Sequence, residues 1–243
     1  MAVSSQIEWT EATWNPITGC TPISSGCKNC YALRMSNRLK AMGNPNYSNG
    51  FALTLHEHML ERPLKWKRPR RIFVNSMSDI FHEDVPLPFI QQIFQVMKKA
   101  NWHTFQILTK RAERLAALAA ELSWTQNIWL GVTVESQEYL HRIDYIRSIN
   151  AGVRFLSLEP LLTSMPKIDL TKIDWVIVGG ESGPHARPMN KDWVENIKTQ
   201  CSQAQVPFFF KQWGGTCKKR SGRLLQGKLF SEFPAPKSFF SDD

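Results

Sequence analysis

The sequence lacks the features that mark membrane, secreted and disordered proteins. No run of about 18 apolar residues occurs, so we expect no membrane-spanning helix. The start of the chain has no basic region followed by an apolar run, so we expect no signal peptide. No linker rich in Gly, Ser or Pro divides the chain, and no low-complexity segment occurs. These features favour one globular domain.

Cysteine is scarce and its number is odd. The 243 residues include five cysteines, of which three lie within residues 20–30. A chain of this length buries enough apolar surface to fold without disulfides, and the cytosol keeps thiols reduced. We therefore expect a cytoplasmic protein whose cysteines are metal ligands or core residues.

Acidic residues are outnumbered by basic ones. There are 21 Asp and Glu against 30 Lys and Arg, which leaves a net charge of +9. An excess of this size favours an anionic partner such as a nucleic acid, a nucleotide or a charged cofactor. The charge alone identifies none of them.

A repeating pattern of strand and helix follows the first seventy residues. Runs rich in β-branched and aromatic residues alternate with segments of helical spacing, which predicts a parallel sheet covered by helices. The predicted strands lie in residues 70–79, 103–111, 127–136, 153–160, 174–183 and 206–215. The predicted helices lie in residues 88–100, 111–121, 137–149 and 191–204. With residues 13–19 as a first strand, the pattern indicates an α/β fold, a partial or complete (βα)6–7 barrel of parallel strands.

We expect a single barrel-like domain over residues 1–243, with an irregular basic insertion around 43–70 and a basic tail over 216–243. The insertion includes RPLKWKRPRR (62–71), in which Trp66 lies among basic residues. Such a mixture can bind phosphates and stack a base. A solvated basic loop explains it equally well.

Polar or small residues end each predicted strand. In parallel α/β proteins the carboxyl ends of the strands meet at one edge, where ligands bind. A strand that merely leaves the core also ends in polar residues, so a single cluster decides nothing, whereas six at one edge indicate a site. The residues are Asn75, Ser76, Ser78, Asp79, Thr109, Lys110, Arg111, Thr133, Glu135, Glu159, Gly179, Gly180, Glu181, Ser182, Lys211 and Gln212.

Cys20, Cys27 and Cys30 form a C-x6-C-x2-C arrangement within a loop that contains glycine and proline. Helical spacing begins directly afterwards, and a helix amino terminus favours the thiolate form that binds metals. Three thiolates without an evident fourth ligand suit a [4Fe–4S] cluster with one open iron, whereas structural zinc needs four ligands. Zinc stays an alternative, because further ligands occur in the chain: His56, His58 and Cys217. Cys201 falls on a helical apolar stripe and is expected in the core.

The motifs WNPITGC, CKNCYA, VNSMSD, LTKR, GVTVE, SLEPL, VGGESG and FFKQWG occur in this order within residues 6–215. On these motifs the chain resembles a phage- and prophage-borne family described as three-cysteine-motif proteins. It also resembles radical S-adenosylmethionine (SAM) enzymes, whose usual spacing, C-x3-C-x2-C, is shorter than here. The resemblance implies that Cys20, Cys27 and Cys30 hold a [4Fe–4S] cluster and that SAM binds its open iron. It further implies reductive cleavage of SAM to a 5′-deoxyadenosyl radical, a reductant such as flavodoxin or ferredoxin, and a dedicated partner protein.

The resemblance also implies roles for residues near the cysteines. Tyr31, next to the third cysteine, matches an aromatic residue that neighbours the adenine of SAM. Ser76, Ser78 and Asp79 are expected to accept hydrogen bonds from the methionyl amine, although a helix N-cap explains Asp79 equally well.

Later strand ends complete the expected SAM site. Gly179 and Gly180 resemble a glycine-rich strand end that packs close to SAM, although glycines also end strands for steric reasons. Glu181 can accept from the amine or the ribose hydroxyls. Lys110, with Arg111, can hold the SAM carboxylate or a substrate phosphate.

Glu135, Glu159 and Lys211 are the candidate catalytic residues. The two glutamates follow buried strands, and burial raises a carboxyl pKa unless a cation is near, so they suit hydrogen bonding or proton transfer. Lys211 ends the last strand beside Gln212 and Trp213, where a polar group next to an aromatic plane suits a base or nucleotide.

The leading hypothesis is a radical-SAM-like iron–sulfur enzyme that acts on a nucleotide, a nucleic acid or another anionic substrate. The second hypothesis is a zinc-stabilised nucleic-acid-binding module without catalysis. The third is a hydrolase or transferase that uses Glu135, Glu159 and Glu181 while the cysteines are structural.

Overall fold

The computed structural model describes residue 5 and residues 7–235. Its large sheet consists of β1 (Ala12–Trp14), β4 (Arg71–Val74), β5 (Thr104–Thr109), β6 (Ile128–Thr133), β7 (Val153–Leu158), β8 (Trp175–Gly179) and β9 (Phe208–Gln212). A second sheet consists of β2 (Ile17–Thr18) and β3 (Thr54–Leu55). The α-helices are α1 (Tyr31–Ala41), α2 (Leu87–Lys99), α3 (Ala112–Leu118), α4 (Lys191–Gln203) and α5 (Lys218–Ser221). The 3₁₀ helices are η1 (Ser25–Cys27), η2 (Pro45–Tyr47), η3 (Glu57–Met59), η4 (Arg62–Lys65), η5 (Ala119–Glu121) and η6 (Gln137–Ile146).

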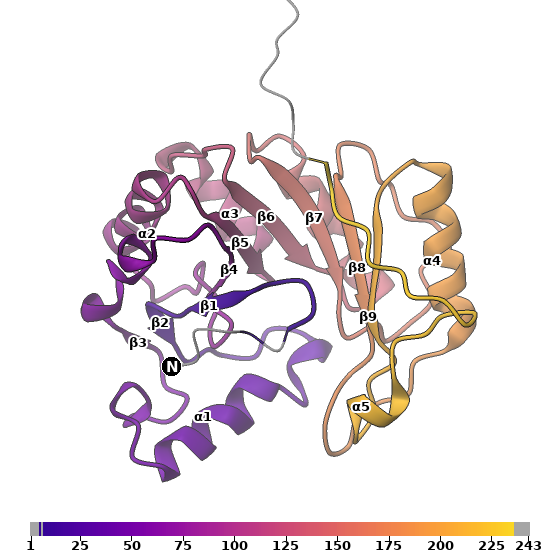
Figure 1. Ribbon diagram of the computed structural model, residues 1–243, viewed down its shortest axis with the longest axis horizontal. Coiled ribbons are helices and arrows are strands. Elements are labelled where there is room, and N and C mark those ends of the chain that lie inside the picture. Colours follow the sequence, from indigo (N-terminus) through magenta and orange to yellow (C-terminus); the bar gives the residue numbers. More distant parts are fainter. Residues whose placement is uncertain (1–4, 6, 236–243) are drawn as a thin grey trace, which may run out of the picture.

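The seven strands of the large sheet are all parallel and follow the order β1-β4-β5-β6-β7-β8-β9. The outer strands β1 and β9 lie at opposite edges of this order, so the sheet is a curled half-barrel and not a closed one (Figure 1). The predicted α/β fold of parallel strands is therefore confirmed, in its partial form.

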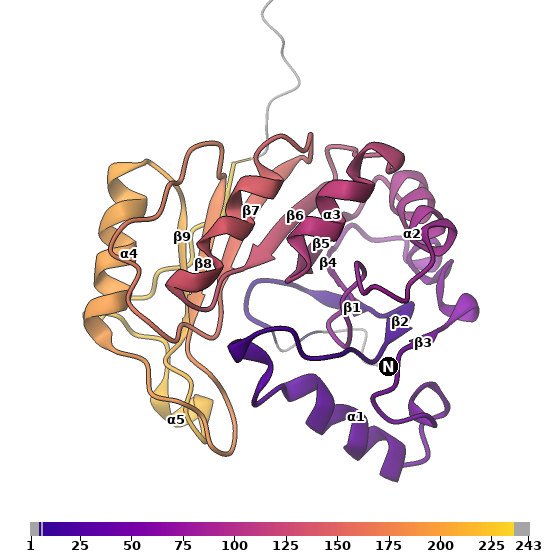
Figure 2. The same ribbon diagram turned by 180° about the vertical axis from the view of Figure 1, so that it is seen from behind.

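Helices cover one face of this sheet, as Figure 2 shows for α2, α3 and α4. In α2 the apolar residues recur at helical spacing and are buried, because that stripe packs on the strands. The strand residues that face the helices form the main core with them, among them Ile72, Val74, Leu130, Val132 and Val176. The link between β7 and β8 contains no helix, because Pro160 and Pro166 disfavour one.

The opposite, concave face is filled with aromatic side chains near the amino ends of the strands. Trp9 is buried there, with ring centroids 4.8 Å from Phe73 and 6.3 Å from Phe155. Trp175 packs against the same group at 6.5 Å from Trp9. Since side chains alternate between the faces of a strand, Phe73 faces this cluster while its neighbours Ile72 and Val74 face the helices. The floor of the half-barrel is therefore closed and apolar, which leaves its carboxyl edge for a site.

The predicted first strand over residues 13–19 is divided in two. β1 ends at Trp14, and the chain turns before β2 pairs antiparallel with β3. Pro16 explains the break, because proline has no N–H to donate to the ladder. β3 and the 3₁₀ helices η2, η3 and η4 lie within the 43–70 insertion. Trp66 of this insertion packs on the core and so differs from a free stacking platform.

The described part of the predicted basic tail packs back along the last strand. The N–H of Phe210 donates to the carbonyl of Phe230 over 2.9 Å, and Phe209 forms an antiparallel bridge with Ser231. The ring of Phe233 lies 4.9 Å from that of Trp175. This segment covers the edge of β9, which would otherwise present unpaired backbone groups.

Within residues 5 and 7–235, no helix is both long enough and apolar enough to cross a membrane.

Candidate active site at the carboxyl edge of the sheet

The loop that carries the cysteines lies across the carboxyl ends of several strands. It begins after β2, contains η1, and ends where Cys30 caps the amino terminus of α1. Gly19 forms a bridge with Ser78, just beyond the end of β4, and has a φ of +84°. A side chain at this position would collide with the backbone of Ala52, so glycine is required both for the conformation and for the close approach.

Cys20 contacts the end of β5 through a buried guanidinium. Nη1 of Arg111 lies 3.4 Å from the Cys20 sulfur and 3.4 Å from Oδ2 of Asp79. Burial raises the pKa of the Cys20 thiol, the positive charge of Arg111 opposes this, and the carboxylate of Asp79 adds to it. Cys20 and Arg111 are thus brought together from positions 91 residues apart.

Cys27 lies over the end of β6. The hydroxyl of Ser24 is 3.6 Å from the Cys27 sulfur and donates a short hydrogen bond to Oε1 of Glu135. Lys110 Nζ is 3.8 Å from the same carboxylate oxygen. Burial opposes ionisation of Cys27, but backbone hydrogen bonds and the charge of Lys110 outweigh it, so the pKa of this thiol is lowered. The predicted residues Cys27, Lys110 and Glu135 therefore form one cluster.

Glu135 is fully buried beneath this loop. Its Oε2 accepts a 2.7 Å hydrogen bond from Nη1 of Arg142, which compensates the buried charge. A side chain at Gly26 would overlap the Glu135 carboxylate. The glycine between Cys20 and Cys27 therefore lets the loop descend onto the strand end.

The segment between Cys27 and Cys30 is bound to the end of β8. Nδ2 of Asn29 donates to Oε2 of Glu181 over 2.8 Å and to the carbonyl of His185 over 3.0 Å. Arg187 donates from Nη2 to Oε1 of Glu181 over 2.6 Å and from Nε to Oε2 over 3.0 Å. Burial opposes ionisation of Glu181, but the donors from Arg187 and Asn29 outweigh it and lower its pKa to about 2.

The first residues of α1 add two further contacts. Tyr31 donates a short hydrogen bond from its hydroxyl to the carbonyl of Ser76, after β4. Arg34 donates from Nη2 to the carbonyl of Ser182 over 2.8 Å, in the loop after β8. Tyr31 is about half exposed as a whole residue, whereas its hydroxyl is engaged by the hydrogen bond to Ser76.

The ends of β7 and β9 form a separate ion pair. Nζ of Lys211 lies 3.1 Å from Oε1 of Glu159, and both side chains are largely buried. Ser157 donates to the other oxygen of Glu159 over 3.2 Å. A side chain at Gly179 would collide with Glu159. The small residue at the end of β8 thus makes room for the pair.

Gly180 has a different reason to be glycine. A side chain there would collide with the carbonyl of Trp213, so the residue allows β8 and the segment after β9 to approach each other. The predicted role of Gly179 and Gly180 beside SAM stays a prediction, and in the structure both glycines already serve packing within the protein.

The residues predicted after β4 differ in how they are engaged. Asp79 accepts hydrogen bonds from Thr109 Oγ1 over 2.7 Å and from the N–H of Lys110 over 3.0 Å, so it joins β4 to β5. It caps no helix. Ser78 donates to the carbonyl of Ile17 over 3.1 Å, and Ser76 donates to Oδ1 of Asn15 over 3.2 Å. Their predicted role towards the methionyl amine stays a prediction.

Asn75 was predicted at a strand end, without a functional role, and the structure makes it a candidate site residue. It is 3% exposed, has a φ of +60°, and its amide oxygen and nitrogen both lack hydrogen-bond partners. Unpaired buried polar atoms are costly, about 1–3 kcal/mol each. Such groups recur at functional sites. Sequence offers one signal, since Asn tolerates a positive φ better than most residues.

The thiols are free, and all three cysteines of the loop are half-buried. Within residues 5 and 7–235, no three Cys, His, Asp or Glu side chains are placed to hold a single metal ion. Four zinc ligands at about 2.3 Å from the metal must lie within about 4 Å of one another. The proposed extra zinc ligands are engaged elsewhere, His56 with Thr18 and His58 with Asn46.

The predicted role of the three cysteines as ligands of an iron–sulfur cluster stays a prediction, and the chemistry of the donors can be compared with it. A [4Fe–4S] cluster distributes its thiolates over different irons, so they lie farther apart than the ligands of one ion. The loop supplies three thiols, which is the number that such a cluster with one open iron needs, and the cations Lys110 and Arg111 lie beside them. Cys201 is buried in the core as predicted, and Cys217 is exposed.

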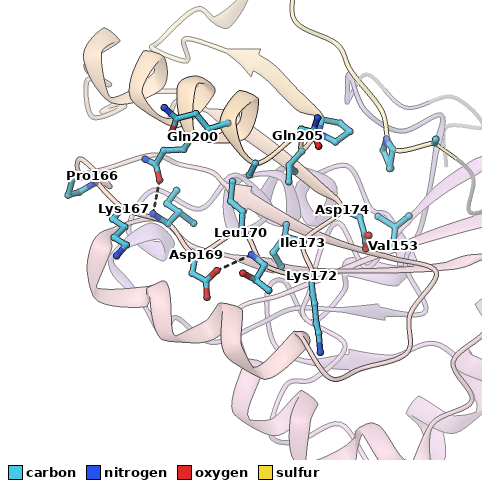
Figure 3. Close-up of a pocket in the computed structure, with 18 residues that line it drawn as sticks. Val153, Pro166, Lys167, Asp169, Leu170, Lys172, Ile173, Asp174, Gln200 and Gln205 are labelled. Atoms are coloured by element: carbon cyan, nitrogen blue, oxygen red, sulfur yellow. Dashed lines mark hydrogen bonds between the residues drawn. The ribbon is translucent and has the colours of Figure 1, made fainter.

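A hollow of about 1010 Å³ lies elsewhere, near the amino ends of β8 and β9 (Figure 3). Loop residues 166–174 and the end of α4 line it. Figure 3 shows Lys167, Lys172 and Asp169 around it without a converging set of polar groups. It belongs to the opposite end of the strands and is not part of the candidate site.

The fold of the chain is similar to that of spore photoproduct lyase, as solved structures of that enzyme show. A mutant spore photoproduct lyase matches with a TM-score of 0.52 and 11% identity, over 82% of this chain and 63% of that one. Two further lyase structures match with TM-scores of 0.47 and 0.42 at 11% and 12% identity. The first is a mutant with bound AdoMet and dinucleoside spore photoproduct, over 79% of this chain and 61% of that one. The second is complexed with dinucleoside spore photoproduct, over 77% of this chain and 59% of that one. The chain thus spans about three fifths of the length of these lyases.

The family of this chain is shown by its sequence. A family model described as "Protein of unknown function (DUF5131)" matches residues 4–234, and the chain belongs to that family. No curated protein matches it.

Proposed function

We propose that this protein is a radical-SAM-type iron–sulfur enzyme that acts on an anionic substrate of the nucleotide or nucleic-acid class. The observation that carries the proposal is the attachment of the three-cysteine loop to three strand ends of a half-barrel. Arg111 joins it to β5, Glu135 to β6 and Glu181 to β8. A loop held at three points positions its ligands against the mouth of the sheet.

In this proposal Cys20, Cys27 and Cys30 hold a [4Fe–4S] cluster. When bound, such a cluster with an open iron supplies the one-electron chemistry that cleaves SAM to a 5′-deoxyadenosyl radical. The protein's own contribution is to orient SAM and to shield the site from water. The ring of Tyr31, a partly exposed residue, offers an apolar plane for the adenine, and Asn75 offers an unpaired donor and acceptor at the end of β4. The aromatic floor around Trp9 excludes water from below.

The class of substrate is inferred from charge. At the mouth itself the cations are matched by carboxylates, as in the pairs Lys211–Glu159 and Arg187–Glu181. Positive charge without a carboxylate partner lies instead on Lys28 of the cysteine loop and on Arg38 and Lys40 in the last turn of α1, which are exposed and form no ion pair within the described residues. Such cations bind phosphates.

The test is anaerobic reconstitution with iron and sulfide, followed by incubation with SAM and dithionite and a search for 5′-deoxyadenosine. The wild type should turn brown, bind about four irons and produce 5′-deoxyadenosine. Cys27→Ala should lose the colour and the product, while Cys217→Ala, which removes an exposed thiol outside the loop, should retain both. A colourless protein that binds zinc would instead support the nucleic-acid-binding module.

The hydrolase or transferase alternative makes an opposite prediction. There, Glu159→Gln would abolish activity and Cys27→Ala would leave it intact. Each of the three glutamates is bound to a cation, Glu135 to Arg142, and the other two as described above. A carboxylate held this way is already engaged by a partner within the protein, so the arrangement favours positioning.

A further inference from the structure

Arg111 lies between the cysteine loop and the first turn of α3 and is almost completely buried, with 3% of its side chain exposed. Its Nη1 points to the sulfur of Cys20 at 3.4 Å. Neither the motifs nor the fold comparison assigns this residue a role towards the cysteines. A buried guanidinium beside a metal-ligand thiol therefore requires its own explanation.

The orientation of Arg111 is fixed on every side. Nε donates to both carboxylate oxygens of Glu83, over 3.0 and 2.8 Å, and Nη1 also donates to Asp79. Nη2 donates to the carbonyl and the hydroxyl of Thr21, each over 3.1 Å, in the residue after Cys20. The planar fork of arginine is needed to reach all these groups at once, which the single ammonium of lysine cannot do.

We propose that Arg111 is a positioning residue that donates a hydrogen bond to the Cys20 sulfur and thereby raises the reduction potential of the cluster. The inference rests on the proposed function. A reduced cluster carries one more negative charge than an oxidised one. A positive charge and a hydrogen bond at a ligand sulfur stabilise the reduced form more, and outer-shell contacts of this kind tune cluster potentials.

Glu83 provides a test of the opposite sign. It lies on the far side of the guanidinium, with 58% of its side chain exposed, so a neutral glutamine is tolerated there. Removing its negative charge leaves the positive charge of Arg111 less compensated. Arg111→Gln should therefore shift the potential negative, and Glu83→Gln should shift it positive by a smaller amount because solvent screens the exposed carboxylate.

The experiment is an anaerobic redox titration of the reconstituted cluster with dithionite, followed by electron paramagnetic resonance. Arg111→Gln should lower the equilibrium constant for reduction about tenfold, which is about 59 mV for one electron. Arg111→Lys, which keeps the charge and loses the fork, should lie between this variant and the wild type. Arg114→Gln is the matched control. Arg114 donates to Phe81 and Val85 from the same helix without reaching the cysteines, so its loss should leave the potential unchanged.

The outcomes separate this inference from the proposed function. If the wild type takes up no cluster, the proposed function fails and this inference fails with it. If the wild type takes up a cluster and Arg111→Gln matches Arg114→Gln in potential, only this inference is overturned. If Arg111→Gln binds no iron, Glu83→Gln decides, because a positive shift supports the inference and an unchanged or negative one overturns it.

Discussion

Asn29 and Glu181, 152 residues apart in the chain, are joined by a 2.8 Å hydrogen bond from the amide nitrogen to the carboxylate. Asn29 lies between Cys27 and Cys30, and Glu181 lies two residues after the end of β8 at Gly179. The same amide nitrogen reaches the carbonyl of His185. One short side chain thus holds the middle of the cysteine loop against the far side of the half-barrel.

Loss of this contact should loosen the loop without unfolding the sheet. We expect Asn29→Ala to speed the loss of iron from the reconstituted protein to a chelator several-fold. Hydrogen bonds that hold the metal ligands in place from outside the coordination sphere contribute about 10-fold or more to metal affinity. Asn29→Asp should lose iron faster still, since it places a second negative charge beside Glu181. Asn49→Ala, which removes an exposed amide bound to Thr54, is the control. Equal iron loss from all three variants would contradict the role of Asn29.

Position 26 should tolerate no side chain as long as residue 135 is a glutamate. We expect Gly26→Ala to destabilise the protein by about 1–3 kcal/mol, because the new methyl group overlaps the Glu135 carboxylate in a packed site. The measurement is urea unfolding of the apoprotein. Ser25→Ala, at the adjacent exposed position, should be near neutral.

A second substitution makes this prediction specific. Glu135→Asp keeps the charge opposite Arg142 and withdraws the carboxylate by one methylene, so it should restore part of the stability lost in Gly26→Ala. Strict additivity of the two changes would show that the cost arises from the backbone and not from contact with Glu135.

The strands could be predicted from sequence because each is apolar on both faces. The run WVIVGG, for example, contains Val176 and Val178 facing the helices and Ile177 facing the concave side, a pattern that only a covered parallel sheet requires. The first strand was harder, because Pro16 divides a run that otherwise reads as continuous. Phe230 and Phe233 pack on β9, and their aromatic character was a sequence signal for burial, but the tail was predicted only as basic.

Sequence could predict which residues gather at this edge of the sheet, but not which contacts they make there. The motifs place Glu135 and Lys110 at strand ends and Cys27 in a loop before a helix, and parallel topology brings the strand ends to one edge. Which cation pairs with which carboxylate depends on side-chain packing. Arg142, for example, reaches Glu135 from η6, and no spacing rule indicates this. The unpaired amide of Asn75 is equally invisible, because burial is a property of the folded chain.

Glu181 should make stability depend on acid pH. Burial opposes its ionisation, but Arg187 and Asn29 lower its pKa from 4.5 to about 2. The unfolded chain therefore binds more protons than the folded one between these values. The stabilisation is complete above about 4.5 and is lost as the pH falls towards 2.

Arg187→Gln should weaken this dependence, because Asn29 and the backbone N–H of residue 187 still donate to Glu181. We expect a loss of about 2 kcal/mol at neutral pH, between the values for exposed and buried pairs, and a smaller loss near pH 2. Urea unfolding at several pH values gives the slope, which should be shallower in the variant. Arg68→Gln, an exposed position on the insertion, should leave the slope as in the wild type. A slope unchanged by Arg187→Gln would assign the acid sensitivity to other carboxylates.

The pair Lys211–Glu159 should behave as a coupled unit in a double-mutant cycle. Lys211→Met leaves the Glu159 carboxylate largely buried with Ser157 as its remaining donor, so we expect a loss of about 2–3 kcal/mol in urea unfolding. Adding Glu159→Gln removes the uncompensated charge and should recover about half of that loss. The exposed pair Lys191–Glu195 on α4, with N and O atoms 3.3 Å apart, is the matched control and should show a coupling below about 1 kcal/mol. Additive effects at Lys211 and Glu159 would mean that the two side chains are solvated independently at the mouth of the half-barrel. In that case the charge of Lys211 would be available to a substrate phosphate.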